Sequence, residues 1–349
     1  MSKVVLLTLL GVAALTAACT GQGATGWSSP IILDDVAYFG VPGGYIHALD
    51  AGGRPQWTVP PPEGEPRSIY SSPTISGDLV LLATFTGQVL ALDSDTGRIA
   101  WDFPTGASVL TDPVAGSDQG YVAASDGKLY AVDLDDGTEQ WRFAADGPFW
   151  AGPALSEGVL YVGSLDRTLY ALRADTGDLV WRAAVDTGVS GSPSVDEDAI
   201  YFGGLDGKVY ALSLASGDLL WTFPTGNWVM SRPLVVENTL YVGSLDHRVY
   251  ALDTRSGDER WHYETGGMVR GSPAYRDGIV FVTSADGTAH AIDSSSGEGI
   301  WTHDLGSQVL AAPAILSDQV IVSAYNLVVT SHDPETGSVL WSFQAGGGS

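Results

Sequence analysis

Tryptophan recurs along this chain at a fixed spacing, and this regularity constrains the fold more than any other feature. The periodic positions are Trp57, Trp101, Trp141, Trp181, Trp221, Trp261, Trp301 and Trp341, so the first interval is 44 residues and the next six are 40 each. A proline keeps the same step, at Pro30, Pro73, Pro113, Pro153, Pro193, Pro233, Pro273 and Pro313. A period of this length is typical of arrays in which one supersecondary unit is repeated.

Each repeat predicts four short strands. In residues 192–221, β-branched and aromatic residues alternate on both sides of the two-residue turn Asp206-Gly207, which is typical of a β-hairpin. Asp, Ser, Gly and Pro separate the remaining segments, and none has a helical apolar period. Eight such units therefore predict an all-β fold, an eight-bladed β-propeller of four-stranded antiparallel blades. The longer first interval predicts a loop insertion at residues 60–66.

Both ends of the repeat array consist of whole units. Pro30 opens the first and Trp341 closes the last, so the sequence predicts a ring that closes without exchanging a strand between its first and last blades. We expect the propeller to span residues 27–345, followed by a flexible tail at 346–349.

The N-terminus has the three-part layout of a secretory signal peptide. A short positive start precedes an apolar run from Val4 to Leu15, which is too short to span a bilayer as a permanent helix, and small residues follow. The next residue, Cys19, is the only cysteine of the chain. We expect a signal peptide at 1–18, lipidation of Cys19 and a tether at 19–26. The alternative is an ordinary secreted protein with an incidental cysteine.

The charge balance excludes some classes of partner. The chain has 41 acidic against 16 basic residues, a formal net charge of −25. Nucleic-acid binding and attachment to an anionic membrane through a basic face both need clustered Lys and Arg, so we expect neither. A strongly acidic surface favours a soluble monomer or suits a saline habitat, and the sequence leaves these two explanations open.

The repeat resembles a known family. Tyr170-Ala171-Leu172 with Asp175-Thr176-Gly177 and Trp181, and the equivalent residues of the other units, resemble the PQQ-binding-like β-propeller repeat. Within that family, short chains with a lipoprotein signal resemble the propeller lipoprotein of the outer-membrane β-barrel assembly machinery (BamB-like proteins), which implies a non-catalytic scaffold. Another branch contains longer quinoprotein dehydrogenases that use calcium and pyrroloquinoline quinone.

Comparing the eight units separates the frame from a candidate site. The periodic tryptophans are frame residues, which we expect to wedge between blades near the Ala-Leu-Asp turns. In the loop before each periodic proline, the residue four places upstream is mostly valine, and we expect it in the core. The residue three places upstream varies most. This mouth ring consists of Trp27, Tyr70, Leu110, Trp150, Ser190, Met230, Arg270 and Leu310.

The mouth ring is predicted to surround one end of the central channel. With Trp228 in one of the same loops, its large apolar residues and arginine form the candidate partner-binding site, because apolar patches on a loop face mark contact surfaces. The alternative is that these side chains only pack the channel mouth.

Motifs for catalysis are missing from the sequence. His47 and His290 occupy a slot held by tyrosine in four blades, which favours strand packing over metal binding. Asp133, Asp135 and Asp136 resemble part of a calcium loop, but their spacing departs from it. The resemblance implies that a quinoprotein enzyme would carry an adjacent cysteine pair against its cofactor, whereas this chain has Cys19 alone. We therefore expect no enzyme activity, no cofactor and no metal site.

Together these features predict an exported lipoprotein, anchored at the periplasmic or outer cell-surface face by its lipid alone. We expect a scaffold that binds an envelope protein, with the outer-membrane barrel-assembly machinery as the candidate partner. The alternative is a small-ligand-binding or PQQ-binding propeller, acting as a quinoprotein-like enzyme or a sensor.

Overall fold

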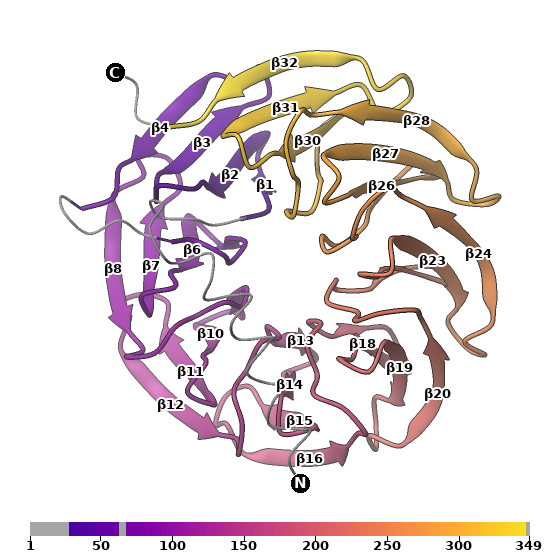
Figure 1. Cartoon of the computed structure of the whole chain (residues 1–349). Helices are drawn as coiled ribbons and strands as arrows, with labels where there is room; N and C mark the ends of the chain where they lie inside the picture. The colour runs from indigo at the N-terminus through magenta and orange to yellow at the C-terminus, as the bar shows by residue number, and fades with distance from the viewer. Residues whose placement is uncertain (1–27, 63–67, 347–349) are drawn as a thin grey trace, which may run out of the picture.

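The computed structural model describes residues 28–62 and 68–346 (Figure 1). The predicted signal peptide, Cys19 and Trp27 lie outside the described residues. No helix in the described part of the chain is long and apolar enough to cross a membrane.

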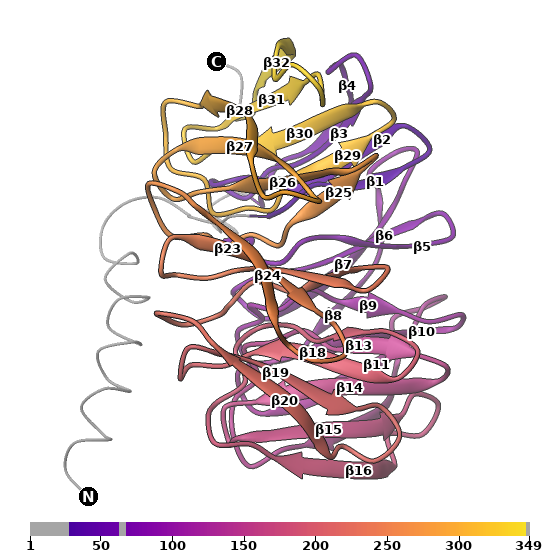
Figure 2. The same ribbon diagram turned by 90° about the vertical axis from the view of Figure 1, so that its right-hand side faces the viewer.

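Eight four-stranded antiparallel sheets surround a central axis, and each is built from four consecutive strands, as predicted (Figures 1 and 2). We number these blades 1 to 8 from the N-terminus. The innermost strands are β1 (Ile31–Leu33), β5 (Thr74–Ser76), β9 (Val114–Ala115), β13 (Ala154–Ser156), β17 (Ser194–Val195), β21 (Leu234–Val236), β25 (Ala274–Arg276) and β29 (Ala314–Leu316). The second strands are β2 (Val36–Gly40), β6 (Leu79–Ala83), β10 (Gln119–Ala123), β14 (Val159–Ser164), β18 (Ala199–Gly203), β22 (Thr239–Gly243), β26 (Ile279–Thr283) and β30 (Gln319–Ser323).

The two outer positions of each blade complete the sheets. The third strands are β3 (Ile46–Asp50), β7 (Gln88–Asp93), β11 (Lys128–Asp133), β15 (Thr168–Arg173), β19 (Lys208–Ser213), β23 (Arg248–Asp253), β27 (Thr288–Asp293) and β31 (Val328–His332). The fourth strands form the rim in Figure 1 and are β4 (Pro55–Val59), β8 (Ile99–Pro104), β12 (Glu139–Ala144), β16 (Leu179–Ala184), β20 (Leu219–Pro224), β24 (Glu259–Glu264), β28 (Gly299–Asp304) and β32 (Val339–Gln344).

The core lies between neighbouring blades rather than at one centre. The second and third strands are buried on both faces, which explains their nearly continuous apolar sequences. Between blades 5 and 6, for example, Tyr201 and Val209 of one sheet pack in one cluster with Leu240 and Tyr250 of the next. Val229, from the connecting loop, belongs to the same cluster and is fully buried. The other predicted core valines, Val109, Val189, Val269 and Val309, are buried as well.

Each periodic tryptophan joins its blade to the following one. The indole N–H of Trp221 donates to the backbone oxygen of Thr254, 2.9 Å away in the next blade, and the ring lies against Gly257. Gly257 has a φ of +75°, a conformation that glycine adopts at little cost. The equivalent hydrogen bond forms from all eight periodic tryptophans, which confirms that they wedge between blades at these turns.

A β-bulge interrupts every fourth strand. In blade 5, Ala211 pairs with Trp221 but Leu212 pairs with Leu219, which leaves Leu220 as the extra residue. The same irregularity occurs in all eight blades. Bulges at a sheet edge disrupt the unpaired ladder, so they oppose edge-to-edge aggregation of the outer rim.

The ring closes by the same contacts that join its interior blades. Trp341 donates to the backbone oxygen of Ala51 at 2.9 Å, and Gln319 also donates to that oxygen at 3.2 Å. β1 to β4 and β29 to β32 form separate sheets, so no strand is exchanged.

The hairpin turns behave as their sequences indicate. Gly207 has a φ of +76°, and Arg167 and His247, which replace glycine in two blades, have φ values of +71° and +74°. His47 and His290 are buried in their strands, in agreement with a packing role.

Candidate functional site at the channel axis

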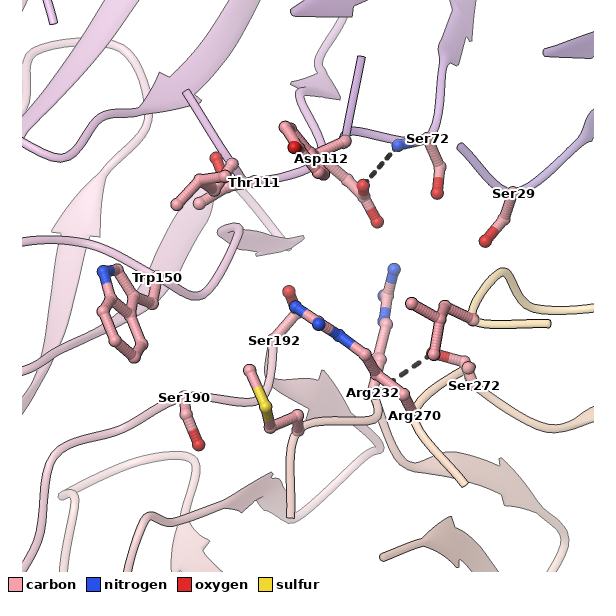
Figure 3. Close-up of a pocket in the computed structure, with 15 residues that line it drawn as sticks. Ser29, Ser72, Thr111, Asp112, Trp150, Ser190, Ser192, Arg232, Arg270 and Ser272 are labelled. Carbon is pink, nitrogen blue, oxygen red and sulfur yellow. Dashed lines mark hydrogen bonds between the residues drawn. The ribbon is translucent and has the colours of Figure 1, made fainter. Parts of the chain in front are cut away.

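A cavity of about 100 Å³ lies on the channel axis (Figure 3). Every blade contributes to its wall through the loop before its innermost strand, which places the cavity at the centre of the ring. The lining residues are Ser29, Tyr70, Ser72, Leu110, Thr111, Asp112, Trp150, Ser190, Ser192, Met230, Arg232, Arg270, Gly271, Ser272 and Leu310.

These loops present alternate residues to the axis because they are extended. In the loop before β21, Val229 and Ser231 are buried, and the Ser231 hydroxyl donates to the backbone oxygen of Gly243 at 2.8 Å. Met230, which lies between these two residues, and Arg232, which follows Ser231, line the cavity. Successive side chains of an extended chain point in opposite directions, so positions three and one before each proline share the channel side.

The structure brings together the seven mouth-ring residues that it describes, since all seven line the cavity, and Trp27 lies outside the described residues. Tyr70 and Ser190 are buried, with exposed fractions of 7% and 3%, and the other five are half-buried. Trp228 does not line the cavity. It is half-buried in the same loop as Met230, and its backbone oxygen accepts a hydrogen bond from the Leu245 N–H.

A second ring lies one place before each proline, and the sequence analysis did not identify it. Its members are Ser29, Ser72, Asp112, Gly152, Ser192, Arg232, Ser272 and Ala312. Four backbone N–H groups of this ring donate to the side chain of the following blade. These bonds run from Ser72 to Asp112, from Gly152 to Ser192, from Arg232 to Ser272 and from Ala312 to Ser29, at 2.5, 2.9, 3.0 and 2.8 Å.

This belt of hydrogen bonds pairs blades 2 with 3, 4 with 5, 6 with 7, and 8 with 1. At this position, blades 2, 4, 6 and 8 each donate a backbone N–H, and blades 3, 5, 7 and 1 each accept it with a side-chain oxygen. Aligning the eight units could have revealed this ring. Four of them have serine at this position, so Asp112 and Arg232 stand out as charged exceptions.

Three charged side chains of the described chain line the cavity, and all three have perturbed pKa values. Burial raises the pKa of Asp112, although the hydrogen bond from the Ser72 N–H and the positive charge of Arg232 oppose this change. Burial lowers the pKa of Arg232, which the negative charge of Asp112 opposes. Burial also lowers the pKa of Arg270 to about 10, and Tyr70 acts in the opposite direction.

The comparisons with known proteins agree with this architecture. Residues 153–348, more than half of the chain, match the family described as "Beta-alanine-activating enzyme, beta-propeller". The chain belongs to this β-propeller family. Residues 42–149 match the family described as "Outer membrane protein assembly factor BamB", so the chain is a PQQ-like propeller that resembles BamB, as its repeats predict. No curated protein sequence matches the chain.

Solved structures with similar folds differ widely in function. BamB from Moraxella catarrhalis aligns with a TM-score of 0.75 and 20% identity, covering 86% of this chain and 95% of its own. The computationally designed Ika8 protein aligns with a TM-score of 0.74 and 17% identity, covering 91% and 96%. A europium-containing methanol dehydrogenase aligns with a TM-score of 0.75 and 14% identity, covering 87% and 83%. At these identities the likeness shows the fold alone.

The cavity does not suit the cofactors of the quinoprotein branch. Calcium takes about six to eight oxygen ligands, with carboxylates prominent among them, whereas this cavity offers one carboxylate, Asp112, beside two arginines. Among residues 28–62 and 68–346, no three His, Cys, Asp or Glu side chains are placed to hold a metal ion. The cavity is also well below the roughly 300–1,000 Å³ of typical small-molecule sites, which disfavours a multi-ring quinone.

Proposed function

We propose that this PQQ-like propeller is a non-catalytic scaffold of the cell envelope whose mouth ring binds another protein. The observation that carries the proposal is the gathering of Tyr70, Leu110, Trp150, Met230 and Leu310 around one channel end. Aromatic residues, methionine and arginine are enriched at protein contact sites, and a few such residues supply most of the binding energy.

The frame of the propeller does not require these residue types. Ser190 fills the same slot in blade 5, where its hydroxyl donates to the Val229 backbone oxygen at 3.1 Å. A small polar residue is therefore compatible with the fold at this position. The fold therefore leaves this position free to carry large residues that contact a partner.

The partner we propose is the outer-membrane barrel-assembly machinery, with the protein anchored by a lipid on Cys19. The BamB family match and the similarity in fold to BamB from Moraxella catarrhalis support this choice over other envelope partners. The anchor rests on the N-terminal signal pattern and the lone cysteine.

The test compares two mouth-ring variants with a rim variant of similar chemistry. Trp150→Ala and Met230→Ala should each weaken binding to purified barrel-assembly components by about 1–3 kcal/mol, while their melting temperatures change little. Leu220→Ala, at a 52% exposed position on the rim, is the matched control and should bind as the unaltered protein does.

Two outcomes would contradict the proposal. If Trp150→Ala unfolds the protein as severely as removal of the frame residue Trp181, the mouth ring only packs the channel. If neither ring variant changes the affinity while Leu220→Ala does, the partner binds the outer rim.

A further inference from the structure

The channel cavity gathers arginines in a protein that is otherwise strongly acidic. The chain carries a net charge of −25, yet among the described residues the charged side chains that line this cavity are two arginines and one carboxylate. Arg232 and Arg270 come from the adjacent blades 6 and 7, and Asp112 comes from blade 3. Figure 3 shows both arginines reaching toward the middle of the cavity, with Asp112 across from them.

Arg232 presents its terminal nitrogens to the cavity. Its Nε donates to the Ser194 hydroxyl at 3.3 Å, and its backbone N–H donates to the Ser272 hydroxyl at 3.0 Å. Within the described chain, its two Nη groups have no hydrogen-bond partner and form no ion pair with Asp112. The side chain stays accessible to solvent along the channel, so an incoming ligand can reach these donors.

The second ring adds further donors. Ser29, Ser192 and Ser272 each use a hydroxyl oxygen to accept a backbone N–H from the preceding blade. A hydroxyl that accepts one hydrogen bond keeps its own hydrogen for donation. The belt thus fixes the three oxygen atoms and leaves three O–H groups on the wall that also holds the guanidinium groups.

The size of the cavity limits what these donors can hold. A volume of about 100 Å³ is below the roughly 300–1,000 Å³ of typical small-molecule sites, so the cavity suits a small ligand. Phosphate and a short dicarboxylate are of this order, and a guanidinium binds either group through two parallel hydrogen bonds. Partial desolvation inside the channel disfavours the charge of Arg232, and an anion beside its guanidinium group would offset that cost.

We propose that the channel binds a small oxyanion, a phosphate or a short dicarboxylate, at the guanidinium group of Arg232, on the wall that it shares with Arg270. Asp112 weakens this binding, because its negative charge faces the anion across the cavity. This site shares the cavity and Arg270 with the mouth ring, but anion binding needs no protein partner and can be measured separately from the proposed scaffold function.

The experiment is isothermal titration calorimetry of the full chain at pH 7 and low ionic strength, with inorganic phosphate and succinate titrated separately. We expect one of these anions to bind with a stoichiometry of one, and the two titrations identify whether the ligand is a phosphate or a carboxylate. Arg232→Gln should weaken this binding at least tenfold. Arg142→Gln, on the outer strand β12 where Arg142 pairs with Glu139, is the control and should leave it unchanged.

Asp112→Asn supplies a second variant with the opposite expectation. Asparagine keeps an oxygen to accept the Ser72 N–H and removes the like charge, so binding should tighten by about threefold to tenfold. The proposal is overturned if neither anion binds to the unaltered protein or to Asp112→Asn. It is also overturned if folded Arg232→Gln binds as tightly as the unaltered protein.

Discussion

The contact between each tryptophan and the glycine of the next blade can be measured by adding one methyl group. A Cβ on Gly257 would lie 2.6 Å from Cδ2 and 2.7 Å from Cε3 of Trp221, closer than side-chain carbons approach one another. Trp221 is only 9% exposed, and Tyr201 also packs against it at a ring distance of 5.8 Å, so the indole has little room to withdraw.

Two terms add to the expected cost of Gly257→Ala. Alanine in the left-handed conformation costs about 1–2 kcal/mol, and forcing a methyl group into a packed contact costs about 1–3 kcal/mol more. Gly106→Ala isolates the first term, because Gly106 has a φ of +76° and no heavy atom within 4 Å of its added Cβ. We therefore expect about 2–5 kcal/mol for Gly257→Ala and about 1–2 kcal/mol for Gly106→Ala.

The assay is urea-induced unfolding at 25 °C followed by circular dichroism, with the denaturant slopes compared to establish that the variants unfold in the same way. A double-mutant cycle completes the test: in a Trp221→Ala background, Gly257→Ala should retain only its conformational cost. Equal destabilisation by Gly257→Ala and Gly106→Ala would refute the idea that this glycine is required by the tryptophan.

Three further predictions concern the anchor, the ring and the pH dependence of stability. Cys19→Ala should release the protein from membranes without unfolding it, because a pair of acyl chains would be the only strong anchor; fractionation and the mass of the N-terminal peptide check this. Deleting residues 313–341 should cause aggregation, since two interblade faces lose their partners, and a monomeric product with a cooperative melt would contradict it. Burial lowers the pKa of His47 to about 4, so below pH 6.5 the unfolded chain takes up a proton that the native protein does not. Stability should therefore fall as pH drops from 6.5 to 4, by up to about 3 kcal/mol from this group, and His47→Gln should make the acid limb of a urea-midpoint profile shallower.

The repeat determined the architecture because each of its features acts over a short distance. Tryptophan, proline and the Asp-Gly turn recur every 40 residues, and every copy makes the same contacts with the following blade. The strand order of a blade was therefore predictable from one repeat, and the number of blades and the closure at Trp341 from the number of repeats. The bulge in each fourth strand was not, because it depends on register against the third strand.

The mouth ring was also accessible from the sequence, since its slot varies most while the neighbouring slot is mostly valine. Sequence comparison did not show how deeply these residues lie. Tyr70 is buried and Trp228 lies outside the cavity, although both occupy the same kind of loop. Burial depends on the neighbours that closure of the ring supplies, and these come from other blades.

The charged centre of the channel was decided only by the tertiary structure. Asp112 and Arg232 are 120 residues apart and belong to blades that share no sheet, so nothing local in the sequence relates them. Closing eight blades around one axis brings one position of every repeat to the same small cavity. The charges of Asp112 and Arg232 act on each other across that cavity. No single repeat contains this interaction, because its two partners come from different blades.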